Sequence, residues 1–319
     1  MKKKILVCGS TGFIGRNTAE AFARLRGYEV YGTYYKTKPF KNPNVKMIKA
    51  DLTDASDVSR AVKGMDCIIQ LAAVTSGAKD IFASPQLHVT DNAVMSALIF
   101  RSAFDNKVSH VIFPSCTTMY QSSSVPLKET DFDANKQIFS GYFGSAWTKI
   151  YNEKMCEFYS RIGDTKFTVI RHSNIYGPFD KFDIEHSHVF GATIAKVMDA
   201  KNGATITVWG EGKEKRDLLY ISDLTDLFKT CLDKQTTKFE LVNAGLGSSI
   251  SVGRLVQKII TLSGKKLKIK HDISKPSIKT TVSLDISKAK DIFGWAPLIT
   301  LDEGIIKTLR WYNKNVGRS

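Results

Sequence analysis

Three glycines spaced three residues apart, Gly9, Gly12 and Gly15, follow a short apolar run at 4–8 and open a segment of helical periodicity. Glycine tolerates backbone angles that other residues resist, and a loop without side chains lets a diphosphate approach the amides at a helix N-terminus. The spacing therefore favours binding of a dinucleotide. The candidate cofactor-binding residues of this loop are Gly9, Ser10, Thr11, Gly12, Phe13, Ile14 and Gly15. A glycine-bearing turn between a strand and a helix also occurs without a ligand, so the segments that follow must decide.

The end of the second predicted strand, 28–34, bears on the choice between NAD and NADP. In dinucleotide folds an acid at this point binds the ribose hydroxyls and selects NAD, whereas basic residues accommodate the additional phosphate of NADP. Here Tyr34, Lys36 and Lys38 stand at the strand end, and residues 34–38 contain no carboxylate. This favours NADP, and NAD is the alternative if the lysines are only exposed loop residues.

Two further strand ends supply candidate contacts to a cofactor. The strands predicted at 45–48 and 67–73 lead toward the same edge of a parallel sheet as the glycine loop. A carboxylate after the first could accept a hydrogen bond from an adenine amine, and alanines at the end of the second leave room for a bound group. The residues concerned are Asp51 and Leu52 after the first strand, and Leu71, Ala72 and Ala73 at the end of the second.

The elements that must position these residues alternate between strand and helix. Apolar runs of four to seven residues alternate with segments of helical period through residue 175, which predicts an α/β fold with a Rossmann-like doubly wound parallel sheet. Beyond that point the pattern loosens into shorter strands and helices. We therefore expect a dinucleotide-binding domain over 1–175, with a return segment near 220–246, and a smaller α+β substrate-binding lobe over 176–319.

Composition excludes several other classes of protein. The net charge of +15 comes from lysines spread along the chain without an aromatic-basic stripe, which favours a solvated surface that steers small anions over a nucleic-acid interface. The five cysteines never form a C-x-x-C pair, so we expect neither a disulfide framework nor a metal site, and a cytoplasmic location. No stretch approaches the roughly 20 apolar residues of a membrane span.

Motifs along nearly the whole chain resemble the extended short-chain dehydrogenase/reductase family of nucleotide-sugar epimerases, dehydratases and reductases. The motifs are Gly9–Gly15, Ala50–Leu52, Leu71–Ala73, Asn92, Ser115–Tyr120, Lys149 with Glu153-Lys154, Arg171–Pro178 and Arg216–Asp223. Within the family, Asn174–Pro178, Ser187-His188-Val189 and Val208-Trp209-Gly210 are similar to the GDP-fucose synthase branch. The resemblance implies an NAD(P) cofactor, a nucleotide-diphosphate sugar as partner, and a homodimer formed through the helix that carries Lys149 and its neighbour.

The family's chemistry uses a tyrosinate acid/base, a lysine four residues later, and a Ser or Thr that hydrogen-bonds the reacting oxygen. By resemblance Lys149 is the lysine, which also holds the nicotinamide ribose, but Ser145 stands four residues before it where the family has tyrosine. Cys116 stands where the family has Ser or Thr, and Thr117 could supply the hydroxyl instead. Tyr142, two helical turns before Lys149, is a candidate replacement acid, although a buried structural tyrosine is the alternative. Nucleophilic catalysis by Cys116 is disfavoured because the sequence offers it no histidine partner.

The remaining site residues are also implied by the resemblance. Asn174, Lys196 and Arg216 would hold the diphosphate of the substrate, and an arginine suits this task because its planar fork pairs with phosphate oxygens. His188 matches a histidine that acts as an acid during epimerisation, with a solvated or merely substrate-contacting histidine as the alternative. Further candidates are Trp209 for the substrate and His172, Asn174 and Ile175 for the cofactor.

Together these features predict an NADP-dependent reductase or epimerase-reductase that acts on a 4-keto sugar nucleotide through an atypical active site. A sugar-nucleotide 4,6-dehydratase or epimerase is the alternative enzyme. The dehydratase ranks lower because Thr117-Thr118 stand where it has an Asp-Glu pair. An NADP-binding sensor or scaffold without activity is the alternative from another class, since it would keep the glycine loop and lose the tyrosine.

Overall fold

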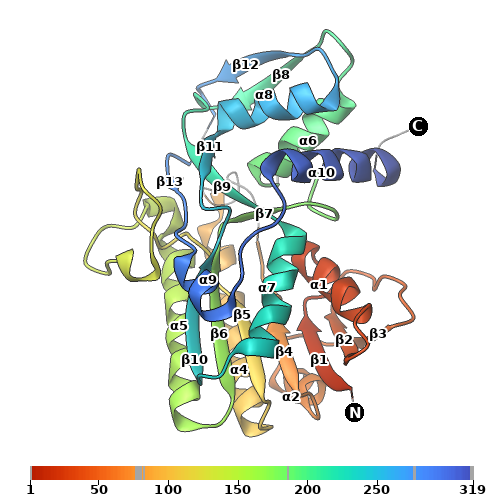
Figure 1. The fold of residues 1–319 in the computed structure, drawn as a ribbon, viewed down its shortest axis with the longest axis vertical. Coiled ribbons are helices and arrows are strands. Elements are labelled where there is room, and N and C mark those ends of the chain that lie inside the picture. Colours follow the sequence, from red (N-terminus) through yellow and green to blue (C-terminus); the bar gives the residue numbers. More distant parts are fainter. Residues whose placement is uncertain (1, 76–80, 82, 185–186, 276–277, 317–319) are drawn as a thin grey trace.

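A seven-stranded parallel sheet forms the centre of the larger part of the molecule (Figure 1). The computed structural model describes residues 2–75, 81, 83–184, 187–275 and 278–316. The strands, in spatial order, are β10 (Phe239–Ala244), β6 (Lys166–His172), β5 (His110–Pro114), β4 (Cys67–Gln70), β1 (Lys3–Cys8), β2 (Tyr28–Tyr34) and β3 (Val45–Lys49). This order and the parallel pairing confirm the predicted doubly wound α/β fold.

Helices cover both faces of the sheet. The helices α2 (Ala55–Val62), α4 (Thr90–Asp105) and α5 (Phe143–Ile162) pack on one face, whereas α1 (Phe13–Ala23), α7 (Ile221–Lys234) and α9 (Ser287–Phe293) belong to the apolar cluster of the other. The central strands β1, β4 and β5 are consequently rich in apolar residues, and the side chains from Ile5 to Cys8 in β1 are fully buried. Asp54 caps α2 by accepting hydrogen bonds from the amides of Ser56 and Asp57.

A second, smaller group of elements lies at the carboxyl ends of the central strands. It contains a sheet in which β9 (Lys215–Tyr220) pairs with β11 (Ser249–Ser251), β13 (Thr281–Val282) and β7 (Asn174–Tyr176). The strands β8 (Thr205–Trp209) and β12 (Lys268–Asp272) form a separate parallel pair. The helices α6 (Val189–Asp199), α8 (Val252–Ser263) and α10 (Leu301–Asn315) pack around these strands (Figure 1). Short 3-10 turns at Pro85–His88, Glu129–Asp131 and Ser140–Tyr142 complete the elements.

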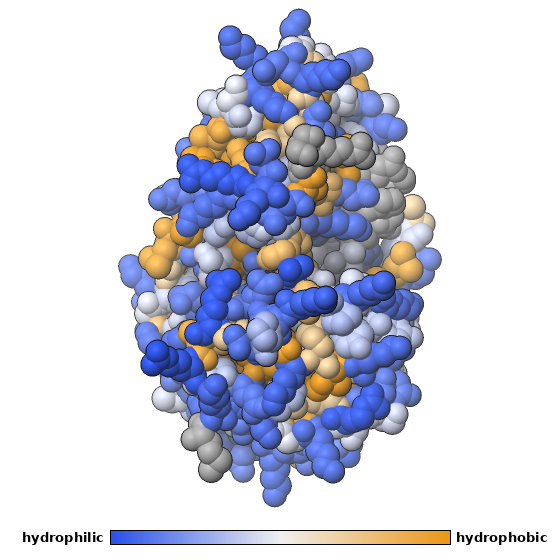
Figure 2. Space-filling model, turned by 90° about the vertical axis from the view of Figure 1, so that its right-hand side faces the viewer, coloured by the Kyte–Doolittle hydropathy of each residue, from blue (hydrophilic) through white to orange (hydrophobic). Residues whose placement is uncertain are grey.

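The face of the molecule that Figure 2 shows is mostly hydrophilic. On the face shown in Figure 2, hydrophobic residues appear in small separate groups among hydrophilic ones. Among the described residues, no helix has the length and apolarity needed to cross a membrane. The same residues contain no cluster of three or more His, Cys, Asp or Glu side chains that could hold a metal ion.

Candidate active site

The glycine loop lies at the carboxyl end of β1, between the ends of β2 and β4. Gly9 adopts a φ of +70°, and a Cβ added to it would lie 2.7 Å from the Cα of Ala72 after β4. A Cβ on Gly15 would lie 2.2 Å from the carbonyl oxygen of Gly9. Only glycine therefore allows the turn and the close approach of α1 to it. The loop is held to β2 because Thr33 accepts from the Ser10 hydroxyl at 2.9 Å and its own hydroxyl accepts from the Gly9 amide at 2.8 Å.

Lys149 and its neighbours on α5 lie at the carboxyl end of β5. The Lys149 ammonium donates to the Pro114 carbonyl at 3.1 Å, and burial lowers its pKa. One turn later, Glu153 forms a buried ion pair with Arg171 of β6 at 2.7 Å and accepts from the Ser115 hydroxyl at 2.6 Å. These contacts fix α5 against β5 and β6, so the ammonium of Lys149 is held at the edge of the sheet where a cofactor would lie.

Ser145 and Tyr142 stand at the beginning of α5. The helix begins at Phe143, so Tyr142 lies just before its first turn. Tyr142 is therefore not, as the spacing predicted, two turns before Lys149 within the same helix. The Ser145 hydroxyl donates to the Tyr142 carbonyl at 3.1 Å. Nearby, the Cys116 sulfur lies 3.0 Å from the Thr118 hydroxyl. Burial raises the pKa of Tyr142, and the charge of Arg216 acts in the opposite direction.

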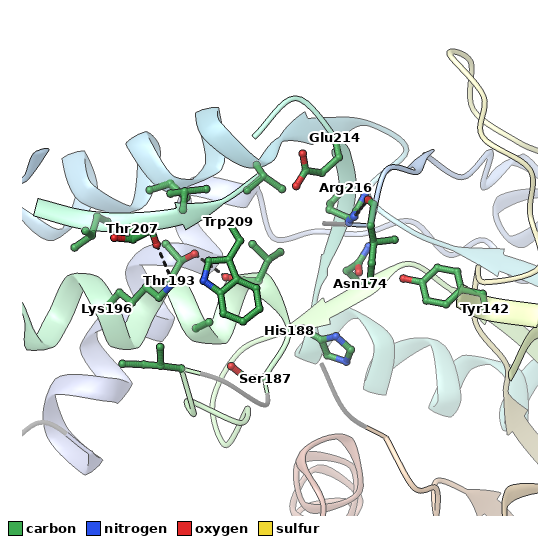
Figure 3. Close-up of a pocket in the computed structure, with 18 residues that line it drawn as sticks. Tyr142, Asn174, Ser187, His188, Thr193, Lys196, Thr207, Trp209, Glu214 and Arg216 are labelled. Atoms are coloured by element: carbon green, nitrogen blue, oxygen red, sulfur yellow. Dashed lines mark hydrogen bonds between the residues drawn. The ribbon is translucent and has the colours of Figure 1, made fainter. Parts of the chain in front are cut away.

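A pocket lined chiefly by the second group of elements gathers all five predicted substrate-binding residues (Figure 3). Asn174, His188, Lys196, Trp209 and Arg216 all line it, although they come from β7, β8, β9 and α6 with its N-cap residue. Figure 3 shows Tyr142 at one end with its hydroxyl toward Asn174 and Arg216, and Lys196, Thr207 and Trp209 at the other end. The sequence-predicted diphosphate residues and the candidate acid therefore face one cavity.

Hydrogen bonds to backbone oxygens orient the cationic side chains of this pocket. Arg216 donates to the carbonyls of Ile278 at 2.7 Å and Thr280 at 2.6 Å. Lys196 donates to the Thr207 carbonyl at 2.9 Å, and its ammonium lies 5.8 Å from the Trp209 ring centroid. Burial lowers the pKa of both cations. A buried cation gains from an anionic ligand, because the ligand replaces the lost hydration.

Not every candidate reaches the pocket. Lys149, Cys116 and Thr117 lie outside its lining. His172 connects the two regions, since its imidazole interacts electrostatically with both Lys149 and His188 and burial lowers its pKa to about 4. Leu52 is buried, and the amide and carbonyl of Ala72 pair with the Gln70 side chain beside the glycine loop.

The comparisons with known proteins agree with this geometry. The model of the NAD dependent epimerase/dehydratase family matches residues 5–245, which span β1 to the end of β10. The chain belongs to this family. A GDP-L-fucose synthase from Azorhizobium caulinodans is 27% identical, over 97% of this chain and 96% of that protein. A GDP-L-colitose synthase from Yersinia pseudotuberculosis is also 27% identical, over 97% of both chains.

Solved structures of similar fold extend over almost the full chain. A UDP-glucose 4-epimerase from Thermotoga maritima, solved with UDP-glucose, superposes with a TM-score of 0.86 at 23% identity, over 98% of this chain and 99% of the other. A UDP-glucuronic acid 4-epimerase from Bacillus cereus, solved with UDP-glucuronic acid and NAD, gives a TM-score of 0.84 at 23% identity, with the same coverage. These structural similarities support the fold that the model gives for this chain.

Membership of the epimerase/dehydratase family makes the protein an NAD(P)-dependent enzyme. The residues present fit this cofactor. The cradle at Gly9 and Gly15 is free of side chains, and the Lys149 ammonium lies at the end of β5. Asp51 retains acceptor capacity for an adenine amine, although its carboxylate also accepts from the Thr53 hydroxyl at 2.6 Å.

Two residues near the site were missed by the sequence reasoning. Arg16 directly follows the last glycine of the loop, and its guanidinium lies 3.9 Å from the Phe179 ring centroid and 5.0 Å from that of Phe40. An arginine at the start of α1 is a signal, visible in the sequence, of a second contact to a cofactor phosphate. Glu214 also lines the pocket. Its signal was weaker, because a lone carboxylate before a strand is usually solvated.

Proposed function

We propose that the protein is an NADP-dependent reductase or epimerase-reductase that acts on a 4-keto sugar nucleotide. The observation that carries the proposal is the shared pocket, in which the Tyr142 hydroxyl faces the same cavity as Asn174 and Arg216 (Figure 3). Cationic and amide groups suit a diphosphate, and a hydroxyl at the end of the row suits the oxygen of a sugar. The named relatives, which include a dTDP-4-dehydro-6-deoxy-D-allose reductase from Streptomyces at 25% identity over 97% of this chain and 96% of that protein, support this class of substrate.

The diphosphate is held by Asn174, Lys196 and Arg216. Arg216 presents its guanidinium from β9, and Lys196 presents its ammonium from α6 on the opposite side of the pocket. The Asn174 amide donates to the Asp217 carbonyl at 3.0 Å, which fixes the direction of the side chain. Trp209 supplies an aromatic wall. Because the sugar follows the diphosphate, this arrangement directs the sugar toward Tyr142.

Tyr142 supplies the proton in the reducing direction. Burial raises its pKa, so the hydroxyl remains protonated at neutral pH and can donate to the oxygen of a ketone as it becomes an alcohol. The nicotinamide, when bound, supplies the hydride. Lys149 holds the nicotinamide ribose from the end of β5, Ser145 supports the Tyr142 backbone, and Cys116 and Thr117 line the cofactor side.

His188 provides the acid/base function that an epimerisation needs. Burial lowers its pKa, and the nearby charges of Lys181 and Arg216 act in the same direction. The imidazole is therefore neutral at pH 7 and can remove a proton from a carbon beside the ketone before it returns one. His188 is the residue directly before α6, and it lines the pocket (Figure 3).

NADP is preferred to NAD because cations surround the expected position of the adenosine ribose. Arg16 lies on the first turn of α1, and Lys36 follows β2 with its ammonium 5.4 Å from the Tyr35 ring centroid. The adjacent carboxylate, Asp51, lies after β3 and is already hydrogen-bonded by Thr53. A 2′-phosphate would pair with the two cations.

The protein is further proposed to act in the cytoplasm as a homodimer. Three large apolar side chains of α5, Tyr151, Phe158 and Ile162, are each more than half exposed, at 55%, 53% and 51%. They follow at intervals of seven and four residues and therefore share one helical stripe.

The cofactor unit comprises 1–175 with 220–246, and 176–319 mainly forms the substrate lobe.

The test is oxidation of NADPH by the purified protein with GDP-, UDP-, CDP- and dTDP-linked 4-keto-6-deoxy sugars. We expect stoichiometric consumption of NADPH with one of them, and much slower consumption by a Lys149→Met control that retains side-chain length without charge. A dehydratase or an epimerase would convert its sugar without net consumption. Tight NADPH binding with no conversion of any sugar would overturn the proposal in favour of a sensor or scaffold.

A further inference from the structure

The guanidinium of Arg16 contacts two aromatic rings that come from distant segments of the chain. Its central carbon lies 3.9 Å from the ring centroid of Phe179 and 5.0 Å from that of Phe40. Phe40 belongs to the loop between β2 and β3, beside the expected position of the adenosine ribose, whereas Phe179 belongs to the segment between β7 and α6. Contacts with ring faces leave the N–H groups of a guanidinium available for a phosphate.

The hydrogen bonding of Arg16 agrees with this availability. Its Nε donates to the Glu20 carboxylate at 3.0 Å, and its side chain is 35% exposed. In the part of the chain that the structure describes, no hydrogen bond engages either terminal nitrogen of Arg16. These nitrogens are the donors that pair with phosphate oxygens. The aromatic contacts and the Glu20 bond therefore hold the side chain without using the donors that a phosphate needs.

Phe179 pays a conformational cost to stand beside Arg16. Its φ is +65°, in the left-handed region that a bulky side chain rarely adopts. The turn is closed by the Asp180 amide, which donates to the Gly177 carbonyl at 3.3 Å. It is attached to α1 by the Asn17 side chain, which donates to the Pro178 carbonyl at 2.8 Å. An unfavourable backbone conformation persists only where its surroundings enforce it, and such outliers gather at functional sites.

The far side of the Phe179 ring is supported by α10. Trp311 packs edge-on against Phe179, with ring centroids 4.8 Å apart and an interplanar angle of 67°. The segment that carries Phe179 thus passes between α1 and α10 (Figure 1). The ring is consequently fixed from both sides, by the arginine of the cofactor unit and by a helix of the substrate lobe.

We propose that Phe179 is a positioning residue that holds Arg16 for the 2′-phosphate of NADP and thereby sets the preference for NADPH over NADH. This inference rests on the proposed function, since it concerns the cofactor of the same reaction. Phe179 acts through Arg16 and touches no part of the cofactor itself. The substrate lobe, which begins after residue 175, therefore completes the selectivity of the cofactor unit.

The test measures the dissociation constants of NADPH and NADH for the full-length protein by isothermal titration calorimetry. We expect the wild type to bind NADPH about 10- to 100-fold more tightly than NADH. Phe179→Gly suits the backbone conformation and removes the ring, so it should reduce this preference about 3- to 30-fold through weaker NADPH binding alone. Phe179→Leu, which keeps apolar bulk without a π face, should act in the same direction. Phe179→Tyr keeps the ring and should retain the wild-type preference within about threefold.

A double-mutant cycle shows whether Phe179 acts through Arg16. In Arg16→Met, which lacks the charge, the further change Phe179→Gly should alter the preference by less than about threefold. Phe182→Leu is the matched control, because its ring packs against Trp311 and Tyr312, with centroids 5.7 and 5.0 Å apart, and the described ring contacts of Arg16 are with Phe40 and Phe179. It should leave the preference unchanged.

Three results would overturn the role of Phe179. One is a wild-type preference that survives in both Phe179→Gly and Phe179→Leu. Another is an equal loss of affinity for NADPH and NADH in these variants, which would mark a structural role. The third is an effect of Phe179→Gly that is as large in Arg16→Met as in the wild type.

The inference and the proposed function fail differently. If NADPH is consumed with a 4-keto sugar nucleotide and Phe179→Gly keeps the preference, the proposed function stands and the role of Phe179 is wrong. If the preference falls as expected and no sugar nucleotide is reduced, Phe179 positions Arg16 and the proposed reaction is wrong. Equal binding of NADPH and NADH by the wild type would overturn both the NADP preference and the role of Phe179.

Discussion

Replacement of Tyr142 by phenylalanine removes the hydroxyl that faces the pocket and keeps the ring. The ring packs edge-on against Phe139 with centroids 5.4 Å apart, and phenylalanine retains that contact, so the stability of the fold should hardly change. A positioned general acid contributes about 10²- to 10⁴-fold to a rate. Tyr142 lies before α5, and Lys149 donates to the Pro114 carbonyl, so the cation whose charge acts on Tyr142 is Arg216. We therefore expect the lower half of that range, about 10²- to 10³-fold, or roughly 3–4 kcal/mol.

The assay is single-turnover oxidation of NADPH at saturating substrate, which isolates the chemical step from product release. The pH dependence gives a second readout. Because burial raises the pKa of Tyr142, the wild-type rate should be flat through neutral pH and fall only above the ordinary tyrosine pKa of about 10. Tyr142→Phe should lose this alkaline limb. Substrate affinity should change little, since the hydroxyl donates to the reacting oxygen chiefly in the transition state.

A second variant keeps the reasoning open to refutation. Tyr142→Phe combined with Ser145→Tyr restores a tyrosine four residues before Lys149 and should recover part of the lost rate. Ser145→Ala alone is the matched control, because it removes only the hydrogen bond to the Tyr142 carbonyl. A rate for Tyr142→Phe within about threefold of the wild type, with the alkaline limb intact, would refute the role of Tyr142. The donor would then be His188, a threonine hydroxyl or water.

Three further predictions concern the scaffold. In Gly15→Ala the new methyl group would lie 2.2 Å from a backbone oxygen, so the variant should weaken NADPH binding at least about tenfold and destabilise the fold by about 1–3 kcal/mol. Gly27→Ala is the control, because nothing lies within 4 Å of the added Cβ, and it should change neither quantity. Fluorescence titration measures the binding, and thermal unfolding measures the stability. Glu153→Gln leaves the buried Arg171 charge unpaired and should cost about 3–5 kcal/mol in urea unfolding; a loss below about 1 kcal/mol would contradict the buried pair. Phe158→Asp on α5 should shift the protein from dimer to monomer in light scattering, and an unchanged mass would exclude this helix as the interface.

Much of the fold was accessible from the sequence because local patterns determine it. The glycine loop, the buried strands and the Asp54 cap each depend on residues within a few positions of one another. The parallel sheet follows from the alternation of these units. The chemistry of the glycine loop was equally local, since it depends on the absence of side chains at Gly9 and Gly15.

The candidate site was accessible only in part, because its geometry depends on distant segments. The orientation of Arg216 is set by carbonyls at Ile278 and Thr280, more than 60 residues away, which no local pattern reveals. The position of Tyr142 depends on where α5 begins, and helix starts are poorly determined by periodicity alone. Glu214 looks like any exposed acid until β8 and α8 are placed around it.

The position of β10 also governs when the chain can fold during synthesis. This strand pairs with β6, yet the 66 residues from 173 to 238, which form β7, α6, β8, β9 and α7, separate the two in the chain. Until the ribosome has released Ala244, the backbone edge of β6 has no partner on that side and is open to pairing with other chains. A fragment that ends near residue 175 would retain the glycine loop and the same open edge. The strand that closes the cofactor sheet is thus delivered only after the polypeptide has supplied β7, β8 and β9. The substrate pocket is completed later still, because Val252, Val256 and Ile278 also line it.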